Sequence, residues 1–280
     1  MKIINSPEQM LAWSAAQLDS GRKIGLVPTM GYFHEGHLRL MRRAAELGDL
    51  VVVSLFVNPI QFGPDEDLAR YPRDLDQDIS LASQEGVAVL FVPDQRAMYP
   101  ESPKTRVTVA GLTEGLCGSA RPGHFDGVCT VVAKLFNIVK PSLAVFGSKD
   151  YQQLAVIRRM VADLSWDVDI IAHPIVRAED GLALSSRNKY LSPEERESAL
   201  SLSKAIGAAL EMVRDGVRDA ALLLAKLEKL IGMHDNVEIE YLTIVDHNDL
   251  TVQQTITENS LLVMAVRVGK TRLIDNSLLF

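Results

Sequence analysis

Two histidines close to a glycine are the first residues in the chain whose types and spacing could do chemistry. His34 and His37 lie three positions apart, with Gly36 between them. They fall where a strand predicted over 24–27 gives way to a helix predicted over 36–47. Ligands of open α/β sheets bind at the carboxyl ends of strands, and the amino end of a helix offers free N–H groups to an anion. The pattern favours a site that holds a phosphate chain.

A zinc site and two solvated surface histidines are the alternative readings of this pair. A His-Glu-x-x-His zinc motif needs its second histidine four positions after the first, and here the spacing is three. Two surface histidines without a function would be the simplest reading of an isolated pair. The glycine beside them and their place between a strand and a helix favour the phosphate site.

Polar side chains follow two more predicted strands. Gln61 comes after the strand predicted over 50–57, and its amide can donate to and accept from a hydroxyl or a carboxylate. Lys149 comes after the strand predicted over 143–146, and Gln153 follows one helical turn later. The lysine would supply a point charge for phosphate. An ordinary turn and a solvated lysine are the alternatives at these two places.

Two further segments carry groups suited to phosphate and metal. Ser185, Ser186 and Arg187 form a loop rich in donors, for which phosphate is a natural ligand and a helix-capping turn is the alternative. Asp78 ends a run of carboxylates over 74–78 that could bind Mg²⁺ through water. On helical spacing alone the same run is a solvated helix start.

The elements that must position these groups alternate between strand and helix through the first two-thirds of the chain. The predicted strands are 24–27, 50–57, 87–92 and 143–146, and the predicted helices are 7–20, 36–47, 74–86, 126–139 and 150–164. Leu50 to Val57 is almost wholly apolar, which is typical of a strand covered on both faces. Alternation of this kind predicts a Rossmann-like, doubly wound parallel sheet of the α/β class.

The pattern changes near residue 177. Two helices are predicted over 193–214 and 218–231, followed by strands over 239–245, 261–268 and 272–275. The chain therefore divides into a Rossmann-like domain over 1–176 and a smaller α+β domain over 177–280.

Composition excludes several classes of function. In a chain of 280 residues, 47% are hydrophobic and 23% are charged, as in an ordinary globular protein. The net charge of −7 makes a duplex-DNA partner unfavourable, and no apolar run approaches the roughly 18 residues of a membrane span. No secretory signal is visible, and Cys117 and Cys129 form no Cys-x-x-Cys motif. We expect a cytoplasmic protein with neither a nucleic-acid nor a membrane partner.

Stretches spread through most of the chain resemble the pantothenate synthetases, or pantoate–β-alanine ligases, of the nucleotidyltransferase superfamily. They are Pro28–Gly31 with His34–His37, Phe56–Pro59 with Gln61–Phe62, Tyr71–Arg73, Arg121–Val128, Phe146–Gly147 with Lys149–Asp150 and Gln152–Gln153, Asp180–Ala183 with Ser185–Asn188, and Thr271–Asn276. The resemblance implies ligation in two steps. The carboxylate of (R)-pantoate attacks the α-phosphate of ATP, and the amine of β-alanine then displaces AMP from pantoyl adenylate.

The resemblance also implies roles for single residues. The catalytic residues would be His34, His37, Lys149 and Arg187, with His37 as the general acid. The ATP-binding residues would be Met30, Gly31, His34, Gly36, His37, Gly147, Ser148, Lys149, Asp150, Val176, Leu184, Ser185, Ser186 and Arg187. Gln61 and Gln153 would bind pantoate, Gln61 would also bind β-alanine, and Asp78 would face Mg²⁺. A homodimer and a carboxyl-terminal domain that closes over ATP are implied as well.

The chain departs from the family pattern in small ways, and the carboxylates over 74–78 also vary among relatives. Tyr32 and Phe33 stand where the family commonly has Ala-Leu, and Leu184 stands where it has Met, so no charged or hydrogen-bonding group is lost. Three other functions stay open. They are AMP transfer to a phosphate ester, which the two glutamines disfavour; nucleotide sensing without turnover; and a tRNA-directed synthetase, which the short chain disfavours.

Overall fold

The computed structural model describes residues 1–64, 66–101 and 103–280, and these form two compact units. Unit 1 comprises Met1–Ser148 and Val156–Pro174, and unit 2 comprises Lys149–Ala155 and Ile175–Phe280. The chain enters the second part of unit 2 after Pro174, close to the boundary expected after residue 176. Lys149–Ala155, which the sequence division places in the first domain, groups with unit 2.

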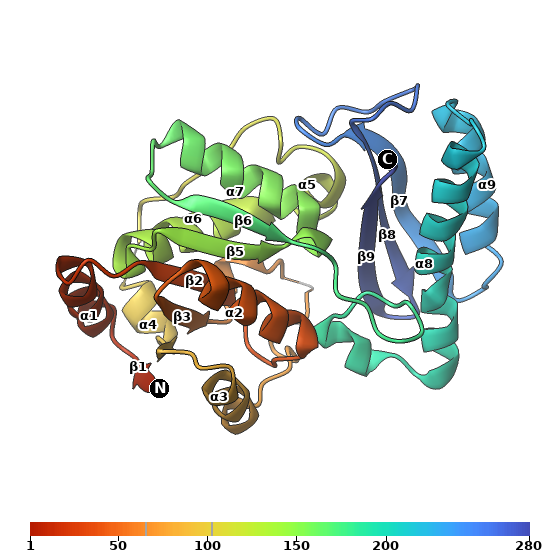
Figure 1. The fold of residues 1–280 in the computed structure, drawn as a ribbon. Helices are drawn as coiled ribbons and strands as arrows, with labels where there is room; N and C mark the ends of the chain where they lie inside the picture. Colours follow the sequence, from red (N-terminus) through yellow and green to blue (C-terminus); the bar gives the residue numbers. More distant parts are fainter. Residues whose placement is uncertain (65, 102) are drawn as a thin grey trace. The chain divides into compact units, whose positions relative to one another are not determined.

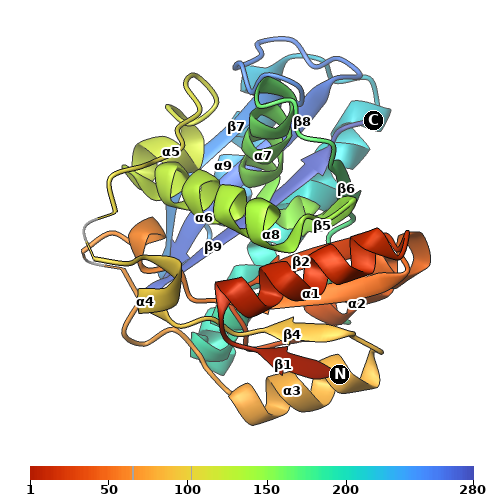
Figure 2. The same cartoon turned by 90° about the vertical axis from the view of Figure 1, so that its left-hand side faces the viewer.

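Unit 1 is built on a six-stranded sheet in the order β1-β4-β3-β2-β5-β6 (Figure 1). The strands are β1 (Lys2–Ile4), β2 (Ile24–Thr29), β3 (Leu50–Leu55), β4 (Val89–Phe91), β5 (Leu143–Gly147) and β6 (Asp169–His173). Each pair of neighbours is parallel, which confirms the predicted sheet. Figure 2 shows β1 and β4 toward one edge and β5 and β6 toward the other. The two edge strands, β1 and β6, were not identified from sequence.

Helices connect the strands of unit 1 in both directions along the sheet. The longer ones are α1 (Pro7–Asp19), α2 (Glu35–Leu47), α3 (Leu75–Gln84), α6 (His124–Val139) and α7 (Tyr151–Asp163), and the short ones are η1 (Pro59–Gln61), α4 (Gln95–Met98), α5 (Leu116–Ala120) and η2 (Ser148–Asp150). Most of η2 and the start of α7, Lys149–Ala155, group with unit 2. The crossover through α2 runs from β2 to β3, and the crossover through α7 runs from β5 to β6, in the opposite direction. Because crossovers are right-handed, α2 and α7 lie on opposite faces. The doubly wound topology is confirmed.

The core of unit 1 explains why its strands read as apolar runs. Val27, Val53, Leu90 and Val145, one from each of the four central strands, share a buried cluster with Met41 of α2. Where β2 and β5 lie side by side, their helices leave on opposite faces. The carboxyl ends of these two strands therefore form a topological switch point, which is where open α/β sheets bind their ligands.

Unit 2 contains a three-stranded antiparallel sheet covered by two helices (Figure 1). Its elements are η3 (Ser186–Tyr190), α8 (Pro193–Arg214), α9 (Ala220–Ile231), β7 (Val237–Asp246), β8 (Ser260–Val268) and β9 (Thr271–Leu278). Leu202 and Leu223 of the helices share a core with Leu262 and Met264 of β8. The predicted small α+β unit is confirmed. No helix in the described ranges has both the length and the apolarity needed to cross a membrane.

Candidate active site

The histidine pair forms the first turn of α2. His34 is the N-cap, and its Nδ1 accepts the N–H of Gly36 at 3.1 Å. The Nδ1 of His37 accepts the N–H of His34 at 3.3 Å, and the two ring centroids are 4.1 Å apart. Both imidazoles therefore lie on one face of the turn. Because each Nδ1 accepts, each neutral ring carries its proton on Nε2, which is the atom that can donate to an anion.

The loop before α2 is held by a buried carboxylate from α3. Gly31 and Tyr32 have positive φ angles of 84° and 54°. Asp78 Oδ2 accepts the N–H of Tyr32 at 2.8 Å, and Oδ1 accepts the N–H of Phe33 at 2.6 Å. A methyl group on Gly31 would lie 2.9 Å from Oδ2, so the loop needs glycine there for its conformation and for space. Asp78 thus fixes how the chain enters the histidine turn.

The prediction that Asp78 faces a metal does not fit this geometry. The residue is 1% exposed, and each of its oxygens accepts a backbone N–H. Burial raises the pKa of Asp78, against the opposing effect of the two N–H donors. In the part of the chain that the structure describes, no group of three or more histidine, cysteine or acidic residues could hold a metal ion. The alternative of a solvated helix start also fails for Asp78, because tertiary contact buries it.

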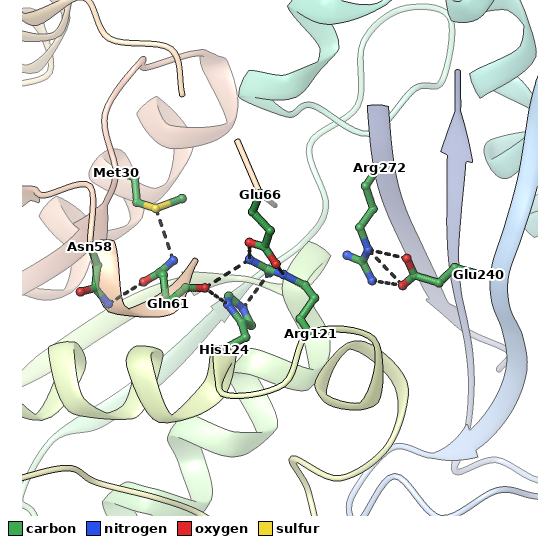
Figure 3. A network of polar contacts seen from close by, with 8 residues as sticks. All are labelled: Met30, Asn58, Gln61, Glu66, Arg121, His124, Glu240 and Arg272. Carbon is green, nitrogen blue, oxygen red and sulfur yellow. Dashed lines mark hydrogen bonds and ion pairs between the residues drawn. The ribbon is translucent and has the colours of Figure 1, made fainter. Parts of the chain in front are cut away.

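Gln61 lies beside Met30 in unit 1 (Figure 3). Its Nε2 is 3.3 Å from Met30 Sδ, and its Oε1 accepts from Asn58 Nδ2 at 2.9 Å. Asn58 also donates to the carbonyl of Gly127 at 3.0 Å and accepts from the Tyr99 hydroxyl at 2.8 Å. The side-chain amide of Gln61 is therefore set by a buried chain of hydrogen bonds.

The backbone of Gln61 is held from α6 as well (Figure 3). Arg121 donates to His124 Nε2 at 2.9 Å and pairs with Glu66, whose Oε1 lies 2.7 Å from Nε. Because arginine only donates, His124 Nε2 accepts and its Nδ1–H donates to the Gln61 carbonyl at 2.8 Å. Sequence reasoning assigned no role to Asn58, Arg121 or His124. Their place in the family stretches was the one signal that could have found them.

Gly147 and Ser148 end the neighbouring strand of unit 1. Gly147 is the last residue of β5, which pairs in parallel with β2. The segment from Gly147 thus starts at the same edge of the sheet as Met30. The structure brings together in unit 1 the predicted residues Met30, Gly31, His34, Gly36, His37, Gly147 and Ser148, with Gln61 alongside.

Unit 2 carries the remaining predicted residues on two segments. Lys149, Asp150 and Gln153 lie in η2 and the first turn of α7. The Lys149 carbonyl accepts from Asn276 Nδ2 of β9 at 2.8 Å.

The second segment is a short hairpin that leads into η3. The N–H of Leu184 donates to the carbonyl of Val176 at 2.9 Å, so two predicted nucleotide residues face each other. Gly181, with a φ of 93°, turns the chain. Ser185 then caps η3, its Oγ accepting the N–H of Arg187 at 3.3 Å. The helix-capping reading of this loop is therefore correct for Ser185.

Two ion pairs tie β9 to other parts of unit 2, one to the hairpin and one to β7. Arg177 binds both oxygens of Asp275, at 2.7 and 2.9 Å, and Asp275 is 2% exposed. Arg272 donates to both carboxylate oxygens of Glu240 across the sheet, with Nε 3.0 Å from each (Figure 3). Sequence reasoning gave no role to these residues.

Residues 2–278 match the family model described as pantoate–β-alanine ligase. The chain belongs to the pantoate–β-alanine ligase family. It is 56% identical to the pantothenate synthetase of Heliobacterium modesticaldum over 276 residues, which cover 99% of this chain and 98% of that one. The crystal structure of pantothenate synthetase from Thermus thermophilus superposes with a TM-score of 0.95 at 44% identity over all of both chains.

A third relative adds ligands to the comparison. The pantoate–β-alanine ligase of Francisella tularensis, described in complex with β-γ ATP and β-alanine, matches with a TM-score of 0.81 at 33% identity, covering 100% of this chain and 98% of that one. The predicted family and the predicted enzyme class, a carbon–nitrogen ligase, are confirmed by these matches. The family name itself contains the predicted acid and amine.

Proposed function

We propose that the protein joins (R)-pantoate to β-alanine at the expense of ATP, giving pantothenate, AMP and pyrophosphate. Full-length membership of the pantoate–β-alanine ligase family carries this proposal. The site geometry supports it, because unit 1 combines a helix amino terminus, two imidazole donors and a fixed amide at one edge of its sheet.

In the first step a carboxylate oxygen of pantoate attacks the α-phosphorus, and the bond to the bridging oxygen of pyrophosphate breaks. Gln61 and Gln153 would orient the acid through its hydroxyl and carboxylate. The Nε2–H groups of His34 and His37 would donate hydrogen bonds to the phosphates, and that of His37 would stabilise the leaving oxygen. Because Nδ1 of His37 already accepts a backbone N–H, the neutral ring would keep its proton instead of acting as the predicted general acid. For such a displacement the protein has to position the two reactants and to direct hydrogen-bond donors at the developing charge.

In the second step the amine of β-alanine attacks the acyl carbon of pantoyl adenylate. The bond from that carbon to the phosphate oxygen breaks, AMP leaves and the amine loses a proton. Gln61 would bind β-alanine here. Lys149, Ser185, Ser186 and Arg187 would bind the β- and γ-phosphates, so their contribution would end when pyrophosphate leaves.

Mg²⁺ would accompany the phosphates of ATP. Magnesium usually keeps its waters and binds substrate phosphates with one or two carboxylates, so a resident cage of protein ligands is not required. Removal of divalent ions by EDTA should abolish adenylate formation, and added Mg²⁺ should restore it. Full activity in EDTA would contradict this part of the proposal.

One assay separates the proposed function from its rivals. ATP–pyrophosphate exchange should depend on (R)-pantoate, and AMP should be released only when β-alanine is added. Exchange that needs a phosphate ester or tRNA would point to another nucleotidyltransferase. ATP binding without exchange would point to a nucleotide sensor.

We also propose a cytoplasmic homodimer. The free thiols of Cys117 and Cys129 are buried and suit a reducing compartment. Burial raises the pKa of Cys129 to about 12, so its thiol should resist labelling until the protein unfolds. The dimer rests on the family resemblance, and light scattering of the purified protein would test it.

A further inference from the structure

Two adjacent residues of β9 each hold a different segment of unit 2 that carries proposed nucleotide-binding residues. Asn276 Nδ2 donates to the Lys149 carbonyl at 2.8 Å, across 127 positions of the chain. Asp275 receives both Nη groups of Arg177, at 2.7 and 2.9 Å. Both β9 side chains are buried, at 2% exposure for Asp275 and 6% for Asn276. One strand is thus the common support of two distant segments.

The contacts of Asp275 extend from Arg177 to the hairpin that precedes η3. Arg177 Nη1 also donates to the carbonyl of Gly181 at 3.1 Å, so the guanidinium joins the strand of the hairpin to its turn. The Asp275 carboxylate accepts the N–H of Asn276 at 2.8 Å as well, which fixes its orientation. Because Ser185 follows this hairpin directly, the direction in which the chain enters η3 depends on the ion pair.

The support itself is rigid. Asp275 and Asn276 pair with Met264 and Val263 of β8, the central strand of the antiparallel sheet. Met264 is fully buried in the core of the unit. A segment tied to such a strand cannot shift without breaking hydrogen bonds to the buried side chains of Asp275 and Asn276, which would lose a polar partner.

We propose that Asp275 and Asn276 are positioning residues, which set the Lys149 turn and the Ser185–Arg187 loop from one strand before ATP binds. This inference rests on the proposed function, because it gives the cations of unit 2 a common task on the β- and γ-phosphates. Neither β9 residue needs to touch the nucleotide. Their effect on catalysis passes through Lys149 and through the hairpin.

The first test is Asn276→Ala, measured separately in the two half-reactions. Pantoate-dependent ATP–pyrophosphate exchange should fall roughly 10–100-fold, since small misplacements of positioning groups cost that much. Conversion of supplied pantoyl adenylate with β-alanine should stay within about twofold of the unchanged protein, because the β- and γ-phosphates are absent from that step. Asn259→Ala, at an exposed asparagine of the same unit, is the matched control and should alter neither rate. Equal losses in both half-reactions would indicate a structural role and overturn the proposal.

A double-mutant cycle tests whether Asn276 acts through Lys149. In a Lys149→Ala background, Asn276→Ala should lower exchange no further, because the group it positions is already gone. Losses that multiply would overturn the assignment.

Asp275→Asn, of nearly equal volume, is the second variant and should show the same selective loss of exchange. If both β9 variants fail to fold, as judged by circular dichroism and thermal unfolding, the residues serve the fold and the proposal is wrong. Exchange measured with the unchanged protein separates failure of the proposed function from failure of the positioning role. Absence of pantoate-dependent exchange in that protein would refute the proposed function itself, whereas normal exchange in both variants would refute the positioning role alone.

Discussion

Units 1 and 2 both use a buried aspartate to hold a segment that carries proposed ligand-binding residues, but the two aspartates bind different partners. In unit 1, Asp78 accepts the backbone N–H groups of Tyr32 and Phe33. In unit 2, Asp275 accepts the guanidinium of Arg177. Asp78 binds the backbone of its loop directly, whereas Asp275 holds the backbone of the hairpin through the long side chain of Arg177.

The donors that the two units would offer to ATP also differ. Unit 1 presents neutral imidazoles at the amino end of α2, where backbone dipoles are already aligned. Unit 2 presents formal charges on Lys149 and Arg187. Fixed neutral donors suit the reacting phosphate, where charge moves during the step, whereas cations suit the end of the triphosphate that departs. We therefore expect changes in unit 1 to lower kcat and changes in unit 2 to act more on KM for ATP.

The largest effects should come from His37→Ala and Lys149→Ala. Each should lower pantoate-dependent pyrophosphate exchange by about 10²–10³-fold, because each removes a group proposed to donate to the phosphates. The loss for Lys149→Ala should shrink as salt rises, since the lysine acts through its charge. Steady-state and exchange kinetics at two ionic strengths would measure this. Lys270→Ala, at an exposed lysine in the β8–β9 turn, is the control for removing a positive charge. An intact exchange rate in either variant would refute that residue's role.

Asp78→Asn should reduce both stability and exchange. The amide keeps one acceptor but turns an NH₂ toward a backbone N–H, so a buried donor loses its partner at a cost of about 1–3 kcal/mol. Urea unfolding would measure the change in the free energy of unfolding. Asp76→Asn, the same substitution on the exposed side of α3, should have no effect. Equal stability of the two variants would show that Asp78 does not anchor the loop.

Gly127→Ala and Gly207→Ala should act in opposite directions. A methyl group on Gly127 would lie 2.5 Å from the Ile60 carbonyl oxygen and 2.6 Å from Gln61 Cα, so overpacking should destabilise the protein by about 1–3 kcal/mol and raise KM for pantoate. At Gly207, exposed in α8, nothing lies within 4 Å, and alanine should stabilise the helix by about 0.5–1 kcal/mol. Thermal unfolding of both variants would measure the opposite changes in stability. The difference between the variants would vanish if α6 could shift away from Gln61.

The smallest effect should come from Arg196→Ala in unit 2. Burial acts to raise the pKa of Asp180, but the Leu182 N–H and the Arg196 guanidinium outweigh it and lower that pKa. A lowered carboxyl pKa stabilises the fold above the ordinary value of 3.8 and loses this effect as the pH falls through the folded-state value. The pair is partly exposed, so we expect about 0.2–1 kcal/mol at pH 7 and less in acid. Urea unfolding at several pH values would measure how the loss of stability in Arg196→Ala depends on pH. A larger loss, or one that grows as the pH falls, would contradict the prediction.

The central elements of the fold could be predicted because their signals are local. The helix predicted over 7–20 forms as α1, because Ser6 caps it and Pro7 occupies its first position. The apolar run from Leu50 gave β3. The edge strands were missed because β1 has three residues and β6 is only partly buried, so neither shows a long apolar run. β2 was predicted over 24–27, but it continues through Pro28 to Thr29, since Pro28 still pairs with Ser54 in the parallel register.

The sequence by itself determined which groups the protein can offer: two imidazoles at one helix start, a lysine and a glutamine at strand ends, and a serine–arginine loop. Spacing along the chain was sufficient because each group sits on its own turn or cap. Only the tertiary structure decided what holds them. Asp78 reaches Tyr32 across 46 positions, His124 reaches Gln61 across 63, and Asn276 reaches Lys149 across 127. Contacts of that length form only when the sheets bring the segments together, so no local pattern specifies them.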